Sequence, residues 1–345
     1  MIKIDTIFIK KIFEDTEPGN SRLEFNIKGS NIDYVIMNTI RRILLSNIPI
    51  YAFAEFNFIK NTSVFHNNYL KLRISNMPVW GIKNNIEILP SNSNSETKLS
   101  NNNLLNETSI EETISDEEDI VNNSEVKSDF EYSSLKELTL YVNYTNNSQI
   151  IESVTTNHAK FYYNKNQIES PYKTPILLVK LQPQQEIEFS AITNLNCEDH
   201  DTIYSAVSIA IYKQISDNEF NFIVESRGQI TEFKAINVAI ANIHHQLALL
   251  NTKLKDIDMK EYENKALGTI EFQSMDATLG NLISRGLQLH SKIDFAGYNT
   301  KHPLIQCITI HYKIKESNII NILFEVIEYL NNLFKSFIIS FNKMK

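Results

Sequence analysis

The feature that most limits how this chain can fold is a narrow apolar stripe between residues 236 and 257. Apolar side chains recur there at alternating steps of four and three residues, which places them on one face of a long helix. A free coiled coil needs about three or four heptads, so this shorter stripe favours packing against one partner helix or sheet. The stripe comprises Ile236, Ile240, Ile243, Leu247, Leu250, Leu254 and Ile257.

A second long helix is expected over residues 317–341, because its apolar residues also share one face. Those residues are Ile319, Leu323, Val326, Ile327, Leu330, Phe334 and Phe337. We expect the two long helices to meet. The predicted seam takes Ile236, Ile240, Ile243, Leu247 and Leu250 from the first helix, and Leu323, Val326 and Leu330 from the second.

Each long helix closes a segment with the same order of elements. Residues 21–29 alternate as a strand, and residues 31–46 predict a helix with Asn31 as its N-cap. Residues 268–274 and a helix opening at Asp276 repeat this order, and the two shorter helices align at a separation of 239 residues. Since a helix and a one-faced sheet must bury their apolar sides together, two such halves predict a pseudo-symmetric dimer within one chain.

A region within the first half is rich in β-forming residues and predicts an inserted, mostly-β domain. Within it, residues 91–128 contain no aromatic residue, glycine or proline and carry nine acidic residues against two lysines, which predicts a disordered or solvated loop. The expected domains are a discontinuous lobe of residues 1–50 and 205–258, the inserted domain 51–204, and a second lobe 262–345. The expected fold class is α+β.

Composition excludes several function classes. The formal net charge is −8, and no cluster of Lys and Arg with interleaved aromatic residues is present, so direct sequence-specific binding of nucleic acid is not expected. No apolar run reaches the roughly 18–20 residues that cross a bilayer, and residues 1–15 lack the order of a secretory signal, so no membrane association is expected. Two cysteines indicate a reducing compartment and cannot form a four-thiolate metal site.

Several short motifs in the first half resemble those of a known family. They are Asn38, Arg41 to Leu45, Ile48-Pro49, Asn61 to Val64 and Met77-Pro78. They resemble the opening of the assembly-platform subunits of multisubunit RNA polymerases: the bacterial alpha subunit, the archaeal D subunit and the third-largest subunit of eukaryotic RNA polymerase II. The last part of the chain resembles the smaller heterodimer partner, the archaeal L type. The matching residues there are Asp276, Thr278 to Leu282, Phe295 to Tyr298 and His302 to Leu304.

The resemblance implies a noncatalytic scaffold in which both partners of a heterodimer are fused, with lobes like the bacterial alpha N-terminal dimerisation lobe. Such a fusion is similar to that of nucleocytoplasmic large DNA viruses, giant or pox-like, and the 41 asparagines fit an AT-rich genome. The implied partners are the largest and second-largest polymerase subunits and small adaptor subunits, with no homodimer. The implied location is the virion and the virus factory in the host cytoplasm.

The resemblance also implies which residues contact partners. Arg41 and Arg42 lie on the polar side of their predicted helix, where guanidinium groups can pair with carboxylates. The remaining predicted interface residues are Asn38, Asp276, Thr278, Leu279, Gly280 and Asn281. Asp276 is further expected to cap its helix and Gly280 to allow close backbone approach, while Gly297 is expected to adopt a φ that other residues avoid.

Two other classes of function remain open on the residues alone. One is an adaptor or regulatory interaction module outside any polymerase, and the other is a small-molecule enzyme built on the inserted domain. Catalysis by two magnesium ions needs clustered carboxylates, whereas Asp256 and Asp258 form only a pair. Family members in several lineages carry a cysteine cluster in the inserted domain, where this chain has Cys197 alone. No catalytic residue, metal or other cofactor is therefore expected.

Overall fold

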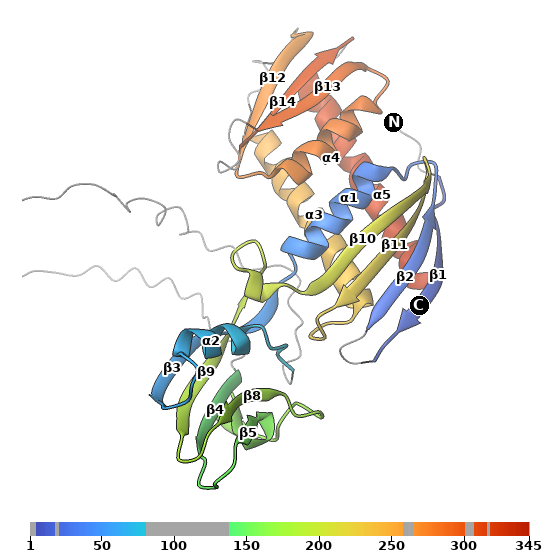
Figure 1. Cartoon of the computed structure of the whole chain (residues 1–345). Helices are drawn as coiled ribbons and strands as arrows, with labels where there is room; N and C mark the ends of the chain where they lie inside the picture. Colours follow the sequence, from blue (N-terminus) through green and yellow to red (C-terminus); the bar gives the residue numbers. More distant parts are fainter. Residues whose placement is uncertain are drawn as a thin grey trace, which may run out of the picture. The chain divides into compact units, whose positions relative to one another are not determined.

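The computed structural model describes residues 5–17, 21–80, 138–257, 262, 265–300, 307–315 and 318–344. All of them belong to one compact unit formed by Met1–Leu89 and Glu137–Lys345. The acidic segment 91–128 and the predicted turn at residues 302–303 lie outside the described residues. Helices and antiparallel sheets alternate along the chain, so the expected α+β class is confirmed (Figure 1).

A four-stranded antiparallel sheet forms the first half. Its strand order is β1 (Phe8–Asp15), β2 (Arg22–Lys28), β11 (Glu219–Ser226) and β10 (Val207–Ser216). The buried face takes Leu23, Phe25 and Ile27 from β2 and alternate residues from β11, which is the period of a half-buried strand. The alternation over residues 21–29 predicted β2, whereas β1 was missed, because its buried residues do not alternate and a bulge interrupts it near Lys11.

Two helices cover this sheet: α1 (Tyr34–Ser46) and α3 (Glu232–Lys255). The expectation that Asn31 caps α1 is wrong, because Asp33 is the N-cap and accepts bonds from the backbone N–H groups of Val35 and Ile36. Asn31 instead donates from Nδ2 to the Tyr329 hydroxyl, 3.3 Å away.

The second half repeats the same plan with one strand fewer. Its sheet has the order β12 (Leu267–Gln273), β14 (Cys307–Ile314) and β13 (Ile293–Thr300), and its helices are α4 (Ala277–Gln288) and α5 (Ile319–Met344). This order corresponds to β2, β11 and β10 of the first half. Asp276 caps α4 as predicted, accepting from the Leu279 N–H at 3.0 Å.

The structure corrects the alignment of the two shorter helices. Their N-caps, Asp33 and Asp276, are 243 residues apart, not the 239 expected from the apolar pattern. At this separation every buried residue of α1 falls on a buried residue of α4, and Asn38 and Arg42 fall on Asn281 and Arg285. The sequence alignment was displaced by about one helical turn, over which an apolar stripe repeats itself.

The two halves share one apolar core. Helix α3 packs against α5 and α1 against α4, so that four helices lie between the two sheets (Figure 1). The far end of α5 reaches the first sheet, where Phe341 contacts Phe25 with ring centroids 5.2 Å apart. The far end of α3 reaches the second sheet, where the Lys253 ammonium donates to the Gln273 carbonyl. Each long helix therefore completes the core of the opposite half.

The inserted region has its own apolar cluster, built on a five-stranded antiparallel sheet. The strand order is β3 (Ile50–Asn61), β9 (Glu186–Asn196), β4 (Leu138–Thr145), β6 (Ala159–Tyr163) and β7 (Asn166–Ile168). A second sheet pairs β5 (Glu152–Thr155) with β8 (Leu177–Leu181), and a helix missed by the sequence reading, α2 (Asn67–Ser75), packs on β3 and β8. The division into three domains at the expected boundaries stays a prediction.

Two glycines permit close helix packing, whereas the expectation for Gly297 is wrong. Gly297 lies within β13 and has no positive φ. A Cβ on Gly280 would lie 2.8 Å from Ile308 Cγ2, and a Cβ on Gly286 would lie 2.5 Å from Val326 Cγ1. Because real Cβ atoms do not approach this closely, α4 can sit against α5 only if residue 286 lacks a side chain.

We expect Gly286→Ala to lower the free energy of unfolding by about 1–3 kcal/mol, because the added methyl group overpacks the contact with Val326. Gly297→Ala is the control: its Cβ would meet only the far end of the exposed Phe295 ring, at 3.3 Å. That variant should stay within about 0.5 kcal/mol of the parent. Urea denaturation of both variants measures the difference, and equal stabilities would contradict the close approach of α4 to α5.

Candidate functional site

The exposed side of α1 is a line of polar and aromatic residues. Asn38 and Arg41 are half-buried, Arg42 is exposed, and Tyr34 begins the line with an exposed ring. Arg41 donates from Nε to Asn38 Oδ1 at 3.0 Å, which orients its guanidinium along the helix surface. The predicted partner-contact residues of α1 are therefore neighbours on one exposed strip.

Two equivalent arginines connect α1 and α4 in a reciprocal way. Arg42 of α1 donates from Nε to the Thr278 hydroxyl in the first turn of α4, at 2.8 Å. Arg285 of α4 donates from Nε to Asp33 Oδ2, at the N-cap of α1, at 2.6 Å. Each helix thus binds the N-terminal end of the other, as expected for an interface that relates two similar halves by a twofold axis.

Asp33 has two roles in this junction. One carboxylate oxygen accepts the two free N–H groups at the start of α1, and the other binds Arg285. The pair is partly shielded, since the side chain of Asp33 is 16% exposed and that of Arg285 34%. A partly buried, charge-assisted bond of this kind stabilises more than a surface ion pair. Neither residue was among the predicted site residues.

The seam between the long helices lies beneath this junction. The eight residues predicted for it are at most 1% exposed: Ile236, Ile240, Ile243, Leu247, Leu250, Leu323, Val326 and Leu330. Polar residues flank the apolar contact, since His244 Nδ1 lies 2.8 Å from Asn331 Oδ1 and the side chains of Asn237 and Asn342 bond to each other. These pairs favour one register of the two helices.

The predicted residues of α4 lie mostly inside the chain. Thr278 and Leu279 are 5% exposed and Gly280 is buried, while Asn281 and Asp276 are half-buried. Thr278 contacts Arg42, and Gly280 faces Ile308 and Tyr298 of the second half's own sheet. Their contact with a separate partner stays a prediction.

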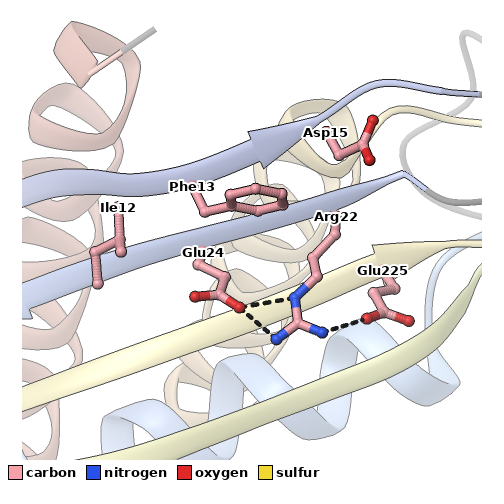
Figure 2. A pocket seen from close by; sticks show the side chains of 6 residues that line it. All are labelled: Ile12, Phe13, Asp15, Arg22, Glu24 and Glu225. Atoms are coloured by element: carbon pink, nitrogen blue, oxygen red, sulfur yellow. Dashed lines mark hydrogen bonds and ion pairs between the residues drawn. The ribbon is translucent and has the colours of Figure 1, made fainter.

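A shallow cavity of about 550 Å³ lies on the outer face of the four-stranded sheet, lined by Ile12, Phe13, Asp15, Arg22, Glu24 and Glu225. Figure 2 shows Arg22 bridging two carboxylates from neighbouring strands. It bonds Glu24 through Nε and Nη2 and Glu225 through Nη1, the last at 3.1 Å. The bond to Glu24 raises the pKa of Arg22. Through its bonds to Glu24 and Glu225, the guanidinium links β2 to β11.

Within the described ranges, no three His, Cys, Asp or Glu side chains gather in a way that could hold a metal ion. No helix in this part of the chain combines the length and the apolar character needed to span a membrane. The arrangement that stands out among the described residues is the junction of α1 and α4, where the two halves meet.

Comparison with known protein families finds one match in each half of the chain. One model described as the RNA polymerase Rpb3/Rpb11 dimerisation domain matches residues 26–247, and a second of the same description matches residues 268–339. This chain belongs to the Rpb3/Rpb11 dimerisation-domain family. It holds two such domains in one polypeptide, which confirms the resemblance drawn from the sequence motifs.

A putative DNA-directed RNA polymerase subunit of Acanthamoeba polyphaga mimivirus is similar to this chain along nearly its whole length. The two are 26% identical over 341 residues, covering 94% of this chain and 91% of the mimivirus protein. The mimivirus protein therefore spans both dimerisation domains and the region between them.

The Asp33–Arg285 bond can be measured with a matched control. Asp33→Asn keeps a good N-cap but removes the carboxylate, so we expect it to lower the free energy of unfolding by about 1–3 kcal/mol. Asp276→Asn makes the same change at the equivalent N-cap, where no arginine of the described residues binds, and should cost less than about 0.5 kcal/mol.

The coupling between the two residues follows from a double-mutant cycle. Asp33→Asn and Arg285→Gln should share a coupling energy of about 1 kcal/mol, because each variant removes the same bond. Chemical denaturation of the parent, the two single variants and the double variant supplies the four stabilities. Additive effects would show that the two side chains do not interact in solution.

Proposed function

We propose that this chain is the noncatalytic assembly subunit of a viral DNA-directed RNA polymerase, in which the two dimerisation domains pair with each other and form a platform for the large catalytic subunits. The observation that carries the proposal is the presence of two domains of one family in a single chain, joined through a shared core and reciprocal arginine contacts. The viral assignment is supported by the end-to-end similarity to the mimivirus protein.

The proposed docking face is the exposed strip of α1, with Arg41 as its main cation. Arg42 and Arg285 are both engaged between the halves, whereas the described contacts of Arg41 stay within α1. The position equivalent to Arg41 in α4 is Ser284, which is only 3% exposed. A partner carboxylate can therefore pair with the Nη groups of Arg41 on one side of the twofold axis, while Nε stays bonded to Asn38. The platform thus distinguishes two partners that bind its two sides.

The proposed partners are the largest and second-largest polymerase subunits and small adaptor subunits, within the virion and the virus factory in the host cytoplasm. Fusing the two domains replaces an encounter between chains with an intramolecular one, at an effective concentration in the millimolar range. No homodimer is needed, because each half already covers the apolar face of the other.

Arg41→Glu tests the docking face. Co-expression of the tagged parent chain with the two large subunits should recover both in equal amounts, and the Arg41→Glu chain should recover at least tenfold less of the second-largest subunit because like charges then meet. Lys213→Glu is the control, since it makes the same charge change at an exposed position of β10. Recovery of the subunit at the parent level by Arg41→Glu would remove this face from the proposal.

Separating the halves tests the internal pairing. Residues 1–258 and 262–345, expressed apart, should aggregate because each exposes the surface that the other half's long helix covers, and co-expression should restore a soluble one-to-one complex. Light scattering after size-exclusion chromatography measures both outcomes. A compact, stable monomer from either piece would contradict the pairing.

An adaptor outside any polymerase is the competing function. The parent chain would then fold as described and leave both large subunits unbound in the co-expression experiment. Binding of the two subunits by the parent chain, lost in Arg41→Glu and kept in Lys213→Glu, would exclude that alternative.

A further inference from the structure

Helix α2 of the inserted region has two apolar faces, and the described residues cover only one of them. Leu70 and Ile74 are 1% exposed and pack into the core beneath β3 and β8. On the opposite face Tyr69 is 48% exposed and Leu72 is 62% exposed, and the preceding Phe65 is 39% exposed. A surface helix normally carries polar residues on its outer face, so this second apolar line calls for a binding partner.

The exposed line has the spacing of a helix that inserts into a groove. Tyr69 and Leu72 stand at positions i and i+3 of α2, a spacing used by helices that anchor in an apolar groove. Phe65 lies just before the N-cap His66 and extends the apolar line at the start of the helix. The rings of Phe65 and Tyr69 already stack, with centroids 4.7 Å apart and an interplanar angle of 16°. This stacking fixes both rings in advance, so little further side-chain ordering is needed on binding.

The charges around the line are of one sign. Residues 56–80 contain Lys60, Lys71 and Arg73 and no Asp or Glu. At about 100° per residue, Arg73 lies roughly 40° from Tyr69, at the rim of the apolar line, and Lys71 lies roughly 160° away. The exposed Arg73 guanidinium donates to the Leu177 carbonyl, which holds it beside the helix. Glu186, on the neighbouring strand β9, is neutralised by its ion pair with Lys60.

We propose that α2 is a second docking element, which inserts Phe65, Tyr69 and Leu72 into an apolar groove with an acidic rim on another polymerase subunit. The proposal rests on the proposed function and extends it, because α2 belongs to the inserted region and shares no residue with the α1 strip. The apolar anchors give the affinity, and a carboxylate of the partner pairs with Arg73.

The test uses the full-length chain and each of the other polymerase subunits, co-expressed one at a time, with dissociation constants measured by biolayer interferometry. Tyr69→Ser combined with Leu72→Ser should weaken the binding of one subunit at least tenfold. Ile150→Ser combined with Ile151→Ser is the control, because it removes two exposed apolar side chains from another part of the inserted region. Circular dichroism and thermal unfolding should show the same fold for both double variants.

Two charge-reversal variants test the role of Arg73 at the rim of the apolar line. Arg73→Glu should weaken binding of the same subunit about tenfold, and more at low salt, because two carboxylates then face each other. Lys71→Glu makes the same change on the opposite side of the same helix and should leave binding within about twofold. Equal effects of the two variants would show that overall charge, and not a contact at the rim, controls binding.

The outcomes separate this proposal from the proposed function. If the subunits bind the parent and the Tyr69→Ser/Leu72→Ser chain equally, while Arg41→Glu releases one of them, α2 is not a docking element and the platform function stands. If no subunit binds the parent, both proposals are wrong. A parent chain that forms a dimer which the double variant dissolves would assign the α2 face to self-association and overturn the docking proposal.

Discussion

The structure depends on one shared apolar core that neither half can complete alone. Phe341 of α5 packs against the first sheet, and the end of α3 reaches the second sheet. Each sheet is therefore covered partly by a helix from the opposite half. Burial of these apolar faces therefore stabilises the two halves together and cannot stabilise either half alone. Reciprocal contacts between α1 and α4 add polar bonds between the two halves to this core.

The apolar patterns were enough to predict both long helices, the central strands and the Asp276 cap, because these depend on periodicity and local chemistry. The α1 cap was placed at Asn31 instead of Asp33, since asparagine and aspartate two residues apart carry the same signal and only the tertiary contacts of Asn31 distinguish them. The predicted separation of 239 residues between the two shorter helices was wrong for a related reason. An apolar stripe repeats at each helical turn, so an alignment shifted by one turn fits the pattern equally well. The Asp33–Arg285 pair joins residues 252 positions apart and has no local signature. Helix α2 was missed because apolar residues on two faces leave no single stripe.

The two halves are alike in plan but differ at equivalent positions of α1 and α4. Where α1 has Arg41, α4 has the buried Ser284, and where Arg285 meets a carboxylate, Arg42 meets a hydroxyl. A single polypeptide can keep such differences without the risk of pairing two identical halves. The surfaces of the two halves therefore differ although their shared core is nearly symmetric.

The placement of Phe341 against Phe25 has a consequence during translation. Helices α1 and α3 can cover part of the first sheet as it leaves the ribosome. The part that Phe341 covers stays exposed until α5 has been made, because β11 ends at Ser226 and α5 begins at Ile319. Folding must then wait for a contact between residues near opposite ends of the chain, which is a slow, high-contact-order step. Such a delay lengthens the time for which an apolar part of the unfinished chain is exposed to water.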